Sequence, residues 1–182
     1  MQLKAKKGFS LVIFFGFCTY TLMSTQIVPF LTHLGYSPTQ RGYVLSMVSV
    51  IAILGQVVMG YISDRYKTMR SLFIYLSLVI VLTAILSYSI EINNFWYHFF
   101  IVGMGAGITK TTINFLESWI MEVDGMQSEF GAIRAYGSLG WSLFSLFSGF
   151  LITQWGYPSL AVITSIFTLV VIFFASKLPD AT

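Results

Sequence analysis

The feature that most constrains the fold is a succession of long apolar runs separated by short polar turns. Six runs fit in the chain, each of about 20 residues, the length that a helix needs to cross the hydrocarbon core of a bilayer. Of the 182 residues, 56% are hydrophobic and 9% are charged, whereas a soluble domain is about a quarter charged. A soluble fold of this length cannot bury so much apolar surface, so the bilayer must be the solvent.

We therefore predict an all-α membrane protein in which residues 1–182 form one bundle of six transmembrane helices. The predicted spans are 8–31, 39–62, 71–90, 95–121, 130–154 and 157–176. The loops between them are short, so sequential helices are expected to pack antiparallel. Cys18 is the single cysteine and lies in the first apolar run, which excludes an intrachain disulfide.

The distribution of Lys and Arg predicts the orientation. Seven basic residues lie at the N-terminus, in the second loop and at the C-terminus, and only Arg41 lies on the other side. The seven are Lys4, Lys6, Lys7, Arg65, Lys67, Arg70 and Lys177. Because basic segments stay in the cytoplasm, both termini are expected there, in the plasma (inner) membrane of a bacterium. The net charge is only +3 and is scattered, so no nucleic-acid partner is expected.

Three ionisable residues, Lys110, Glu117 and Arg134, lie inside sequence that is otherwise apolar enough for lipid. Ionisable side chains at membrane depth are costly, so each is a candidate for function. Seven residues are close to two helical turns, so Lys110 shares a helix face with Glu117, and Arg134 shares one with Trp141. The four residues therefore form two polar faces on neighbouring spans.

In an antiparallel helix pair, residues equidistant from the turn lie at one level. Around a turn near Gly125, Glu117 is level with Arg134, and Lys110 is level with Trp141. The spacing predicts a carboxylate paired with a guanidinium and an ammonium on an indole face. We interpret these two levels as a solute site with Lys110, Glu117, Arg134 and Trp141 as substrate-binding residues.

Plainer interpretations remain open. Glu117 and Arg134 could form a structural salt bridge, or Arg134 could extend its guanidinium into the cytoplasm. Lys110 could extend to an interface, although it lies near the middle of its span. The acidic residues around the turn are expected to be solvated charges at helix ends. These are Glu122, Asp124 and Glu129.

The loop between the second and third spans reads GYISDRYKTMR over residues 60–70. From charge alone it is an ordinary cytoplasmic loop, in which Gly60 permits close helix approach and Asp64 can cap or pair at a helix end. The pattern also resembles the loop 2–3 signature of the major facilitator superfamily. That resemblance implies a conformational switch formed by Gly60, Asp64 and Arg65, whose charges stabilise one conformational state.

A loose copy of residues 60–66 recurs at residues 149–156, at the end of the fifth span. By the predicted topology the two copies lie on opposite sides of the membrane. A three-plus-three inverted repeat would place them in this way, and such repeats occur in each six-helix half of these transporters.

A closer resemblance follows from Glu117 together with FGAIRAYGSLGW over residues 130–141. This region resembles helices 4 and 5 of the lactose permease group, the oligosaccharide:proton symporters. The resemblance implies that Glu117 and Arg134 hydrogen-bond sugar hydroxyls and that Trp141 stacks on the sugar ring. Lys110 has no charged counterpart in that group, so the solute could differ and carry a negative charge.

The function expected from these resemblances is proton-coupled uptake of a sugar or sugar-like solute by alternating access. The chain would form the N-terminal half of the transporter, with a second, C-terminal six-helix half as its partner. Alternatives are an exporter of drugs or metabolites from the same superfamily and a non-transporting half that needs a partner. The sequence contains no phosphate-binding loop, no Cys/His metal spacing and no nucleophile–base pattern, so we expect neither an enzyme nor a cofactor or metal.

Overall fold

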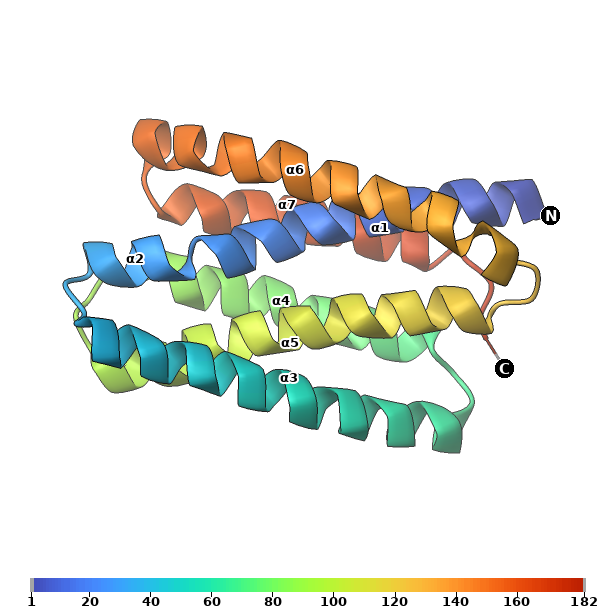
Figure 1. Cartoon of the computed structure of the whole chain (residues 1–182), viewed down its shortest axis with the longest axis horizontal. Coiled ribbons are helices and arrows are strands. Elements are labelled where there is room, and N and C mark those ends of the chain that lie inside the picture. Colours follow the sequence, from blue (N-terminus) through green and yellow to red (C-terminus); the bar gives the residue numbers. More distant parts are fainter. Residues whose placement is uncertain (1, 182) are drawn as a thin grey trace.

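The computed structural model describes residues 2–181, and their fold is entirely helical (Figure 1). The elements are α1 (Gln2–Thr25), α2 (Ile27–His33), α3 (Pro38–Tyr66), α4 (Arg70–Ser89), α5 (Phe95–Glu122), a 3-10 turn (Gln127–Glu129), α6 (Phe130–Trp155) and α7 (Pro158–Ala175). With α1 and α2 taken together, six segments of the described chain are long and apolar enough to cross a membrane. The predicted all-α class is confirmed.

The first span differs from its predicted form in two ways. Its helix begins at Gln2 rather than at residue 8, so the N-terminal lysines are part of α1. The helix is also interrupted at Gln26, where α1 ends and α2 begins. Pro29 explains the interruption, because a proline has no N–H to donate to the carbonyl of Thr25 four residues earlier.

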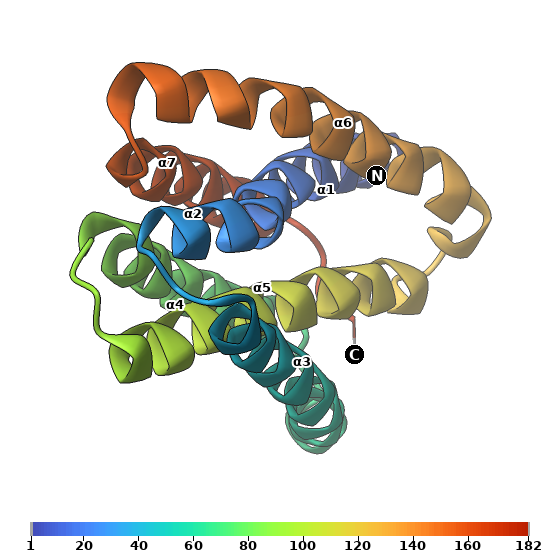
Figure 2. The same cartoon turned by 60° about the vertical axis from the view of Figure 1, so that its left-hand side comes forward.

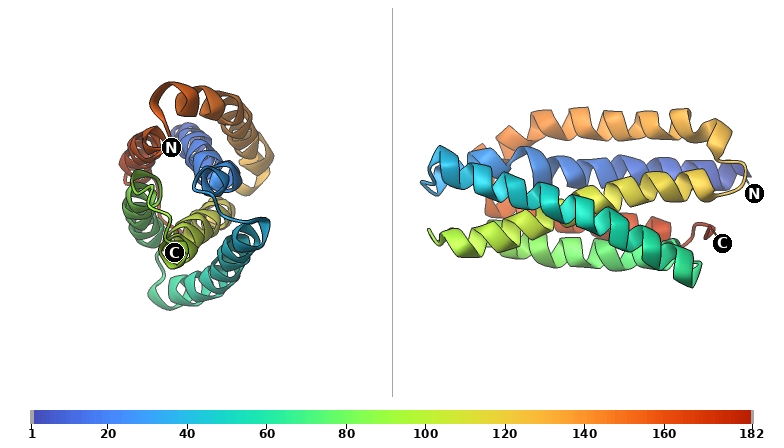
Figure 3. Two further views of the ribbon diagram at one scale, coloured as in Figure 1. Left: turned by 90° about the vertical axis from the view of Figure 1, so that its left-hand side faces the viewer. Right: turned by 60° about the horizontal axis from the view of Figure 1, so that its bottom comes forward.

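The packing of the helices has an internal symmetry. Helix α1 packs against α6 and α7, α5 packs against α3 and α4, α4 packs against α7, and α1 packs against α5. Exchanging α1 with α5, α3 with α6 and α4 with α7 converts this set of contacts into itself. A three-plus-three inverted repeat requires this exchange, and the end-on view in Figure 3 shows α1 and α5 adjacent in the middle of the bundle.

The expectation that all sequential helices pack together is wrong. Helices α3 and α4 have little contact, and α5 and α6 diverge from their connecting turn, as Figure 2 shows. Small residues decide these partners. Gly137 and Gly140 of α6 face Phe17 and Phe14 of α1, so α6 packs closely on α1 instead of on α5.

The glycines of α5 allow the neighbouring helices to pack closely. A Cβ at Gly107 would lie 2.9 Å from the Val48 carbonyl of α3, and one at Gly105 would lie 3.0 Å from Thr83 of α4. Neither helix could approach α5 as closely if these positions carried side chains. Helix α5 is therefore held between α3 and α4, and it also packs against α1.

Both termini lie at the same end of the bundle, together with the α3–α4 and α5–α6 connections (Figure 1). This arrangement agrees with an even number of spans. By the predicted orientation this is the cytoplasmic end.

Candidate functional site

The structure brings Glu117 and Arg134 together. Arg134 Nε lies 2.5 Å from Glu117 Oε1, so the pair bridges α5 and α6 little more than one turn from their connection. The two side chains remain partly open, with exposed fractions of 36% for Arg134 and 28% for Glu117. An ion pair that is neither buried nor fully solvated keeps hydrogen-bonding capacity for a third group, since a carboxylate has several acceptor positions and a guanidinium five N–H donors.

An aromatic row supports this pair from α1. The Arg134 guanidinium carbon lies 4.2 Å from the ring centroid of Phe17, which is a cation–π contact. Phe17 contacts Tyr20 edge-on, and the Tyr20 ring lies 5.3 Å from that of Trp141. The row therefore connects the ion pair to the indole two turns further along α6.

No sequence pattern predicts that Phe17 and Tyr20 belong to this site. Their spacing of three residues places them on one face of a helix, but no charge marked that face. Only the packing of α1 against α6 shows which face it meets.

The predicted contact between Lys110 and Trp141 does not form in the described chain. Trp141 is half-buried against Tyr20, and Lys110 is exposed. The cation–π contacts of the described residues involve Arg65, Arg134 and Lys177 instead. The divergence of α5 and α6 is the reason, because it separates residues more the further they lie from the turn.

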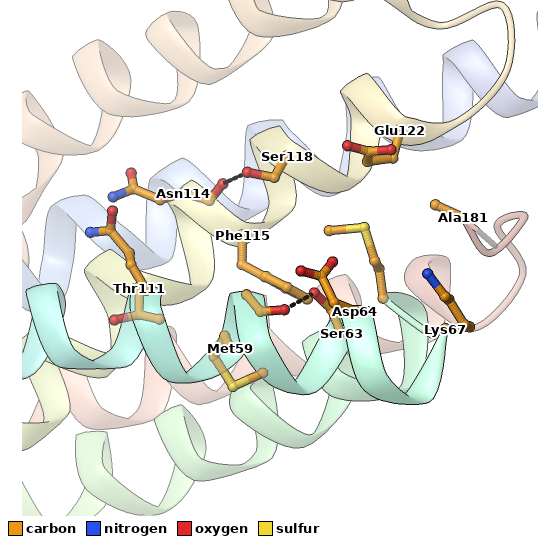
Figure 4. A pocket seen from close by; sticks show the side chains of 13 residues that line it. Met59, Ser63, Asp64, Lys67, Thr111, Asn114, Phe115, Ser118, Glu122 and Ala181 are labelled. Atoms are coloured by element: carbon orange, nitrogen blue, oxygen red, sulfur yellow. Dashed lines mark hydrogen bonds between the residues drawn. The ribbon is translucent and has the colours of Figure 1, made fainter.

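A second polar region is a cavity of about 480 Å³ between α3 and α5 (Figure 4). Two carboxylates, Asp64 and Glu122, and the ammonium-bearing Lys67 lie around it. The other polar side chains are Gln56, Ser63, Thr111, Asn114 and Ser118. This cavity lies at the end of the bundle that carries the termini, on a different helix pair from the Glu117–Arg134 site.

The predicted switch residues occupy different surroundings in this region. Asp64 lines the cavity, whereas Arg65 reaches the hydroxyl of Tyr61 at 3.4 Å. Gly60 has nothing within 4 Å of the position of a Cβ, so no helix among residues 2–181 makes a close approach there. Asp64 forms no ion pair within residues 2–181, and the role of these residues as a switch stays a prediction.

Asp180 makes the helix-capping contacts that were expected of Asp64. Its carboxylate accepts hydrogen bonds from the backbone N–H groups of Met69 and Arg70, each at 2.8 Å, and from the Thr68 hydroxyl at 2.7 Å. These N–H groups open α4, where a helix lacks internal acceptors and favours a negative charge. Arg70 in turn donates to the Leu178 carbonyl at 3.0 Å.

The electrostatics of Asp180 follow from these contacts. Burial opposes ionisation, but the hydrogen bonds from Arg70, Thr68 and Met69 and the charge of Arg70 outweigh it and hold the pKa of the carboxyl below its usual range. No sequence pattern predicted a role for Asp180. A Pro-Asp pair directly after a span is consistent with a helix end, but nothing in the sequence indicates which helix the carboxylate reaches.

One of the acidic residues near the turn is not merely solvated. Glu129 Oε2 lies 2.5 Å from Lys6 Nζ, so the start of α6 is joined to the first turns of α1. The expectation of a free helix-end charge is therefore wrong for Glu129.

Comparison with known proteins identifies the family to which the chain belongs. The profile of the MFS_1 like family matches residues 8–181, nearly the whole chain. The chain belongs to this family. It is a transporter family of the major facilitator superfamily, not a family of enzymes.

Two curated relatives of this MFS_1 like chain are named as transporters. AmpG 1 of Rickettsia typhi is 25% identical over 153 residues, which cover 81% of this chain and 34% of that protein. AmpG 1 of Rickettsia conorii is 25% identical over 154 residues, which cover 81% of this chain and 37% of that protein. The chain spans about a third of the length of these relatives. The finer resemblance to the lactose permease group stays a prediction.

Solved structures place the same six helices in half of a major facilitator fold. The nucleoside transporter NupG matches with a TM-score of 0.81 at 13% identity, over 98% of this chain and 45% of that one. A D-xylose-proton symporter matches with a TM-score of 0.69 at 12% identity, over 98% and 48%. At such identities the likeness shows the fold alone.

Proposed function

We propose that this MFS_1 like chain forms the N-terminal half of a secondary transporter that takes up a sugar or sugar-like solute together with protons. The observation that carries the proposal is the partly exposed Glu117–Arg134 pair, which joins two helices that otherwise diverge. In the major facilitator fold the solute binds near the middle of the bilayer, between the two halves, and they rock around it.

The chemistry of the site suits a polyhydroxyl solute. A carboxylate accepts hydrogen bonds from hydroxyl groups and a guanidinium donates to them. The half-buried Trp141 offers an aromatic surface to the apolar side of a sugar ring. Tyr20 holds that indole in place, so the aromatic surface is set before the solute arrives.

The direct test is solute binding to the chain in lipid nanodiscs, followed by the intrinsic fluorescence of tryptophan and by thermal stability. A panel of mono- and disaccharides should include one that raises the unfolding temperature of the wild type. Glu117→Gln and Arg134→Lys should abolish that rise, the second because lysine lacks the fork of parallel donors. Glu122→Gln is a substitution of the same kind at the end of α5 and serves as the matched control. It should retain the rise in unfolding temperature.

Coupling is tested by uptake in cells that express the chain together with a second six-helix half. The proposal expects sugar accumulation that collapses when the proton gradient is dissipated. Sugar accumulation that survives dissipation of the proton gradient would contradict proton coupling. In the binding assay, loss of binding in the Glu122→Gln control would contradict the Glu117–Arg134 site.

A second candidate is export of an anionic metabolite or drug, and Lys110 favours it. Lys110 is exposed on α5 and forms no ion pair within residues 2–181, so its charge is free to meet an anionic solute. Under this alternative Lys110→Gln abolishes binding while Trp141→Phe has little effect. Under the sugar proposal Trp141→Phe weakens binding more than Lys110→Gln does.

A further inference from the structure

We propose that a groove between α1 and α6, separate from the solute site, binds one anionic phospholipid. The groove has a volume of about 580 Å³. Lys6, Lys7 and Ser10 form its polar part, Leu11, Phe14 and Tyr136 form its apolar part, and Leu3 lies at the lysine end. Neither the family nor the transport chemistry requires such a site.

The two parts of the groove lie at different depths. Helices α1 and α6 run side by side in the same direction from the end that carries the termini (Figure 1). The contact between Lys6 and Glu129 fixes their relative level. Tyr136 is seven residues beyond Glu129, which places it about 10 Å further along the axis. The lysines therefore lie at the mouth of the groove, and Phe14 and Tyr136 lie at its deep end.

The groove opens on the side away from the ion pair. Arg134 and Tyr136 are two residues apart on α6, and two residues are separated by about 200° around a helix. Since Arg134 points toward Glu117 on α5, Tyr136 points toward the opposite flank of α6. That flank is free of the polar solute site, and the apolar groove side chains Tyr136 of α6 and Leu11 of α1 are exposed by 47% and 40%.

The net positive charge at the mouth of the groove favours an anionic ligand. Lys7 is exposed and forms no ion pair within residues 2–181, and Glu129 is the carboxylate that meets Lys6. Free phosphate would match the lysines but leave the apolar depth of the groove in water. A phospholipid matches both, because its phosphate lies at headgroup level and its acyl chain extends into the hydrocarbon region.

The test is native mass spectrometry of the purified chain in detergent with added phosphatidylglycerol or phosphatidylcholine. We expect one retained phosphatidylglycerol per chain and less phosphatidylcholine. Lys7→Gln should lower phosphatidylglycerol retention about five-fold, the effect of one basic residue near a charged lipid surface. Lys4→Gln removes the same charge from the same helix end without lining the groove, so it is the matched control and should change retention little.

Two further variants sharpen the test. Glu129→Gln removes the carboxylate beside Lys6 and should raise phosphatidylglycerol retention. Tyr136→Ser should lower retention of both lipids, since it removes apolar wall rather than charge. Circular dichroism of each variant confirms that the helices remain folded, so that a lost adduct reports on the groove.

Several outcomes would overturn the proposal. Equal losses in Lys4→Gln and Lys7→Gln would show a diffuse surface charge instead of a site. Displacement of the lipid by glycerol 3-phosphate would show a site for small anions. A dimer whose formation excludes the lipid would show that a second copy of the chain covers the groove.

Discussion

Helices α1 and α6 form a pair that corresponds, in the internal repeat, to the pair of α5 and α3. In the middle of the membrane each pair has a close backbone approach at a glycine, which lies on α6 in the first pair and on α5, the counterpart of α1, in the second. Gly140 lets α6 approach the backbone of α1 at Phe14, and Gly107 lets α5 approach the backbone of α3 at Val48. The repeat is inverted, so the end that carries the termini exposes non-equivalent parts of the two pairs: α1 and α6 enclose a basic and apolar groove there, whereas α5 and α3 enclose a polar cavity with two carboxylates.

The difference shows which part of a membrane bundle is constrained. Within the hydrocarbon region, helices associate through close packing, and small residues are required whatever the function. At the interface, water and headgroups can satisfy charges, so the side chains of the two pairs can diverge. Substitutions at the shared glycines and at the distinct ends should therefore have effects of different size.

The largest effect is expected at the glycine contacts. Gly140→Ala places a Cβ against the Phe14 carbonyl, and such overpacking costs about 2 kcal/mol. Gly107→Ala should cost a similar amount if the two pairs are equivalent. Thermal unfolding in detergent measures both. Gly149→Ala is the control on α6, since nothing lies within 4 Å of its Cβ position, and it should be neutral or slightly stabilising. If Gly140→Ala leaves the unfolding temperature unchanged while Gly107→Ala lowers it, the two helix pairs do not depend on their glycines to the same extent.

A smaller effect is expected at the α4 cap. Asp180→Ala removes the acceptor of the Met69 and Arg70 N–H groups, and loss of a helix cap costs about 1 to 2 kcal/mol. Asp180→Asn keeps one acceptor oxygen and should cost less. The measurement is the unfolding temperature of each variant at neutral pH. Equal stability of wild type and Asp180→Ala would show that the C-terminal segment does not hold α4.

The same carboxylate predicts a pH dependence. The pKa of Asp180 is lowered in the folded chain. The contribution of this carboxylate to the free energy of unfolding is therefore complete above the ordinary aspartate pKa, about 3.9. It is lost as the pH falls through the lowered folded-state pKa. The difference in unfolding temperature between wild type and Asp180→Asn should therefore shrink as the buffer is taken from about pH 6 to pH 3. A difference that grows on acidification would contradict the assignment.

The smallest effect is expected at Asp64. Asp64 is exposed beside the cavity and has no ion pair within residues 2–181. Asp64→Asn should change the stability of the chain by less than about 0.5 kcal/mol, as surface substitutions usually do. Unfolding temperatures of Asp64→Asn and Asp180→Asn, measured side by side, test the contrast. A large loss in Asp64→Asn would mean that Asp64 already holds a partner in this half.

Much of the fold was predictable because the bilayer leaves few choices. Apolar runs of membrane length must be helices, since a strand or loop would leave backbone groups without partners in lipid. The Glu117–Arg134 pair was also predictable, because both residues lie near a short turn, where two helices cannot yet have diverged. The contact of Lys110 with Trp141 failed for the same geometric reason, since both lie further from the turn.

The sequence by itself determined six membrane-length helices, their membership of one bundle and the two charged residues that meet near the turn. Only the tertiary structure decided that α6 packs on α1, that Phe17 and Tyr20 support the ion pair, and that Asp180 caps α4. The physical reason is that hydrophobicity is a property of each segment, whereas the partner of a helix face depends on where small residues allow another backbone to approach. Such contacts join residues more than a hundred positions apart, such as Met69 and Asp180, and no local pattern encodes them.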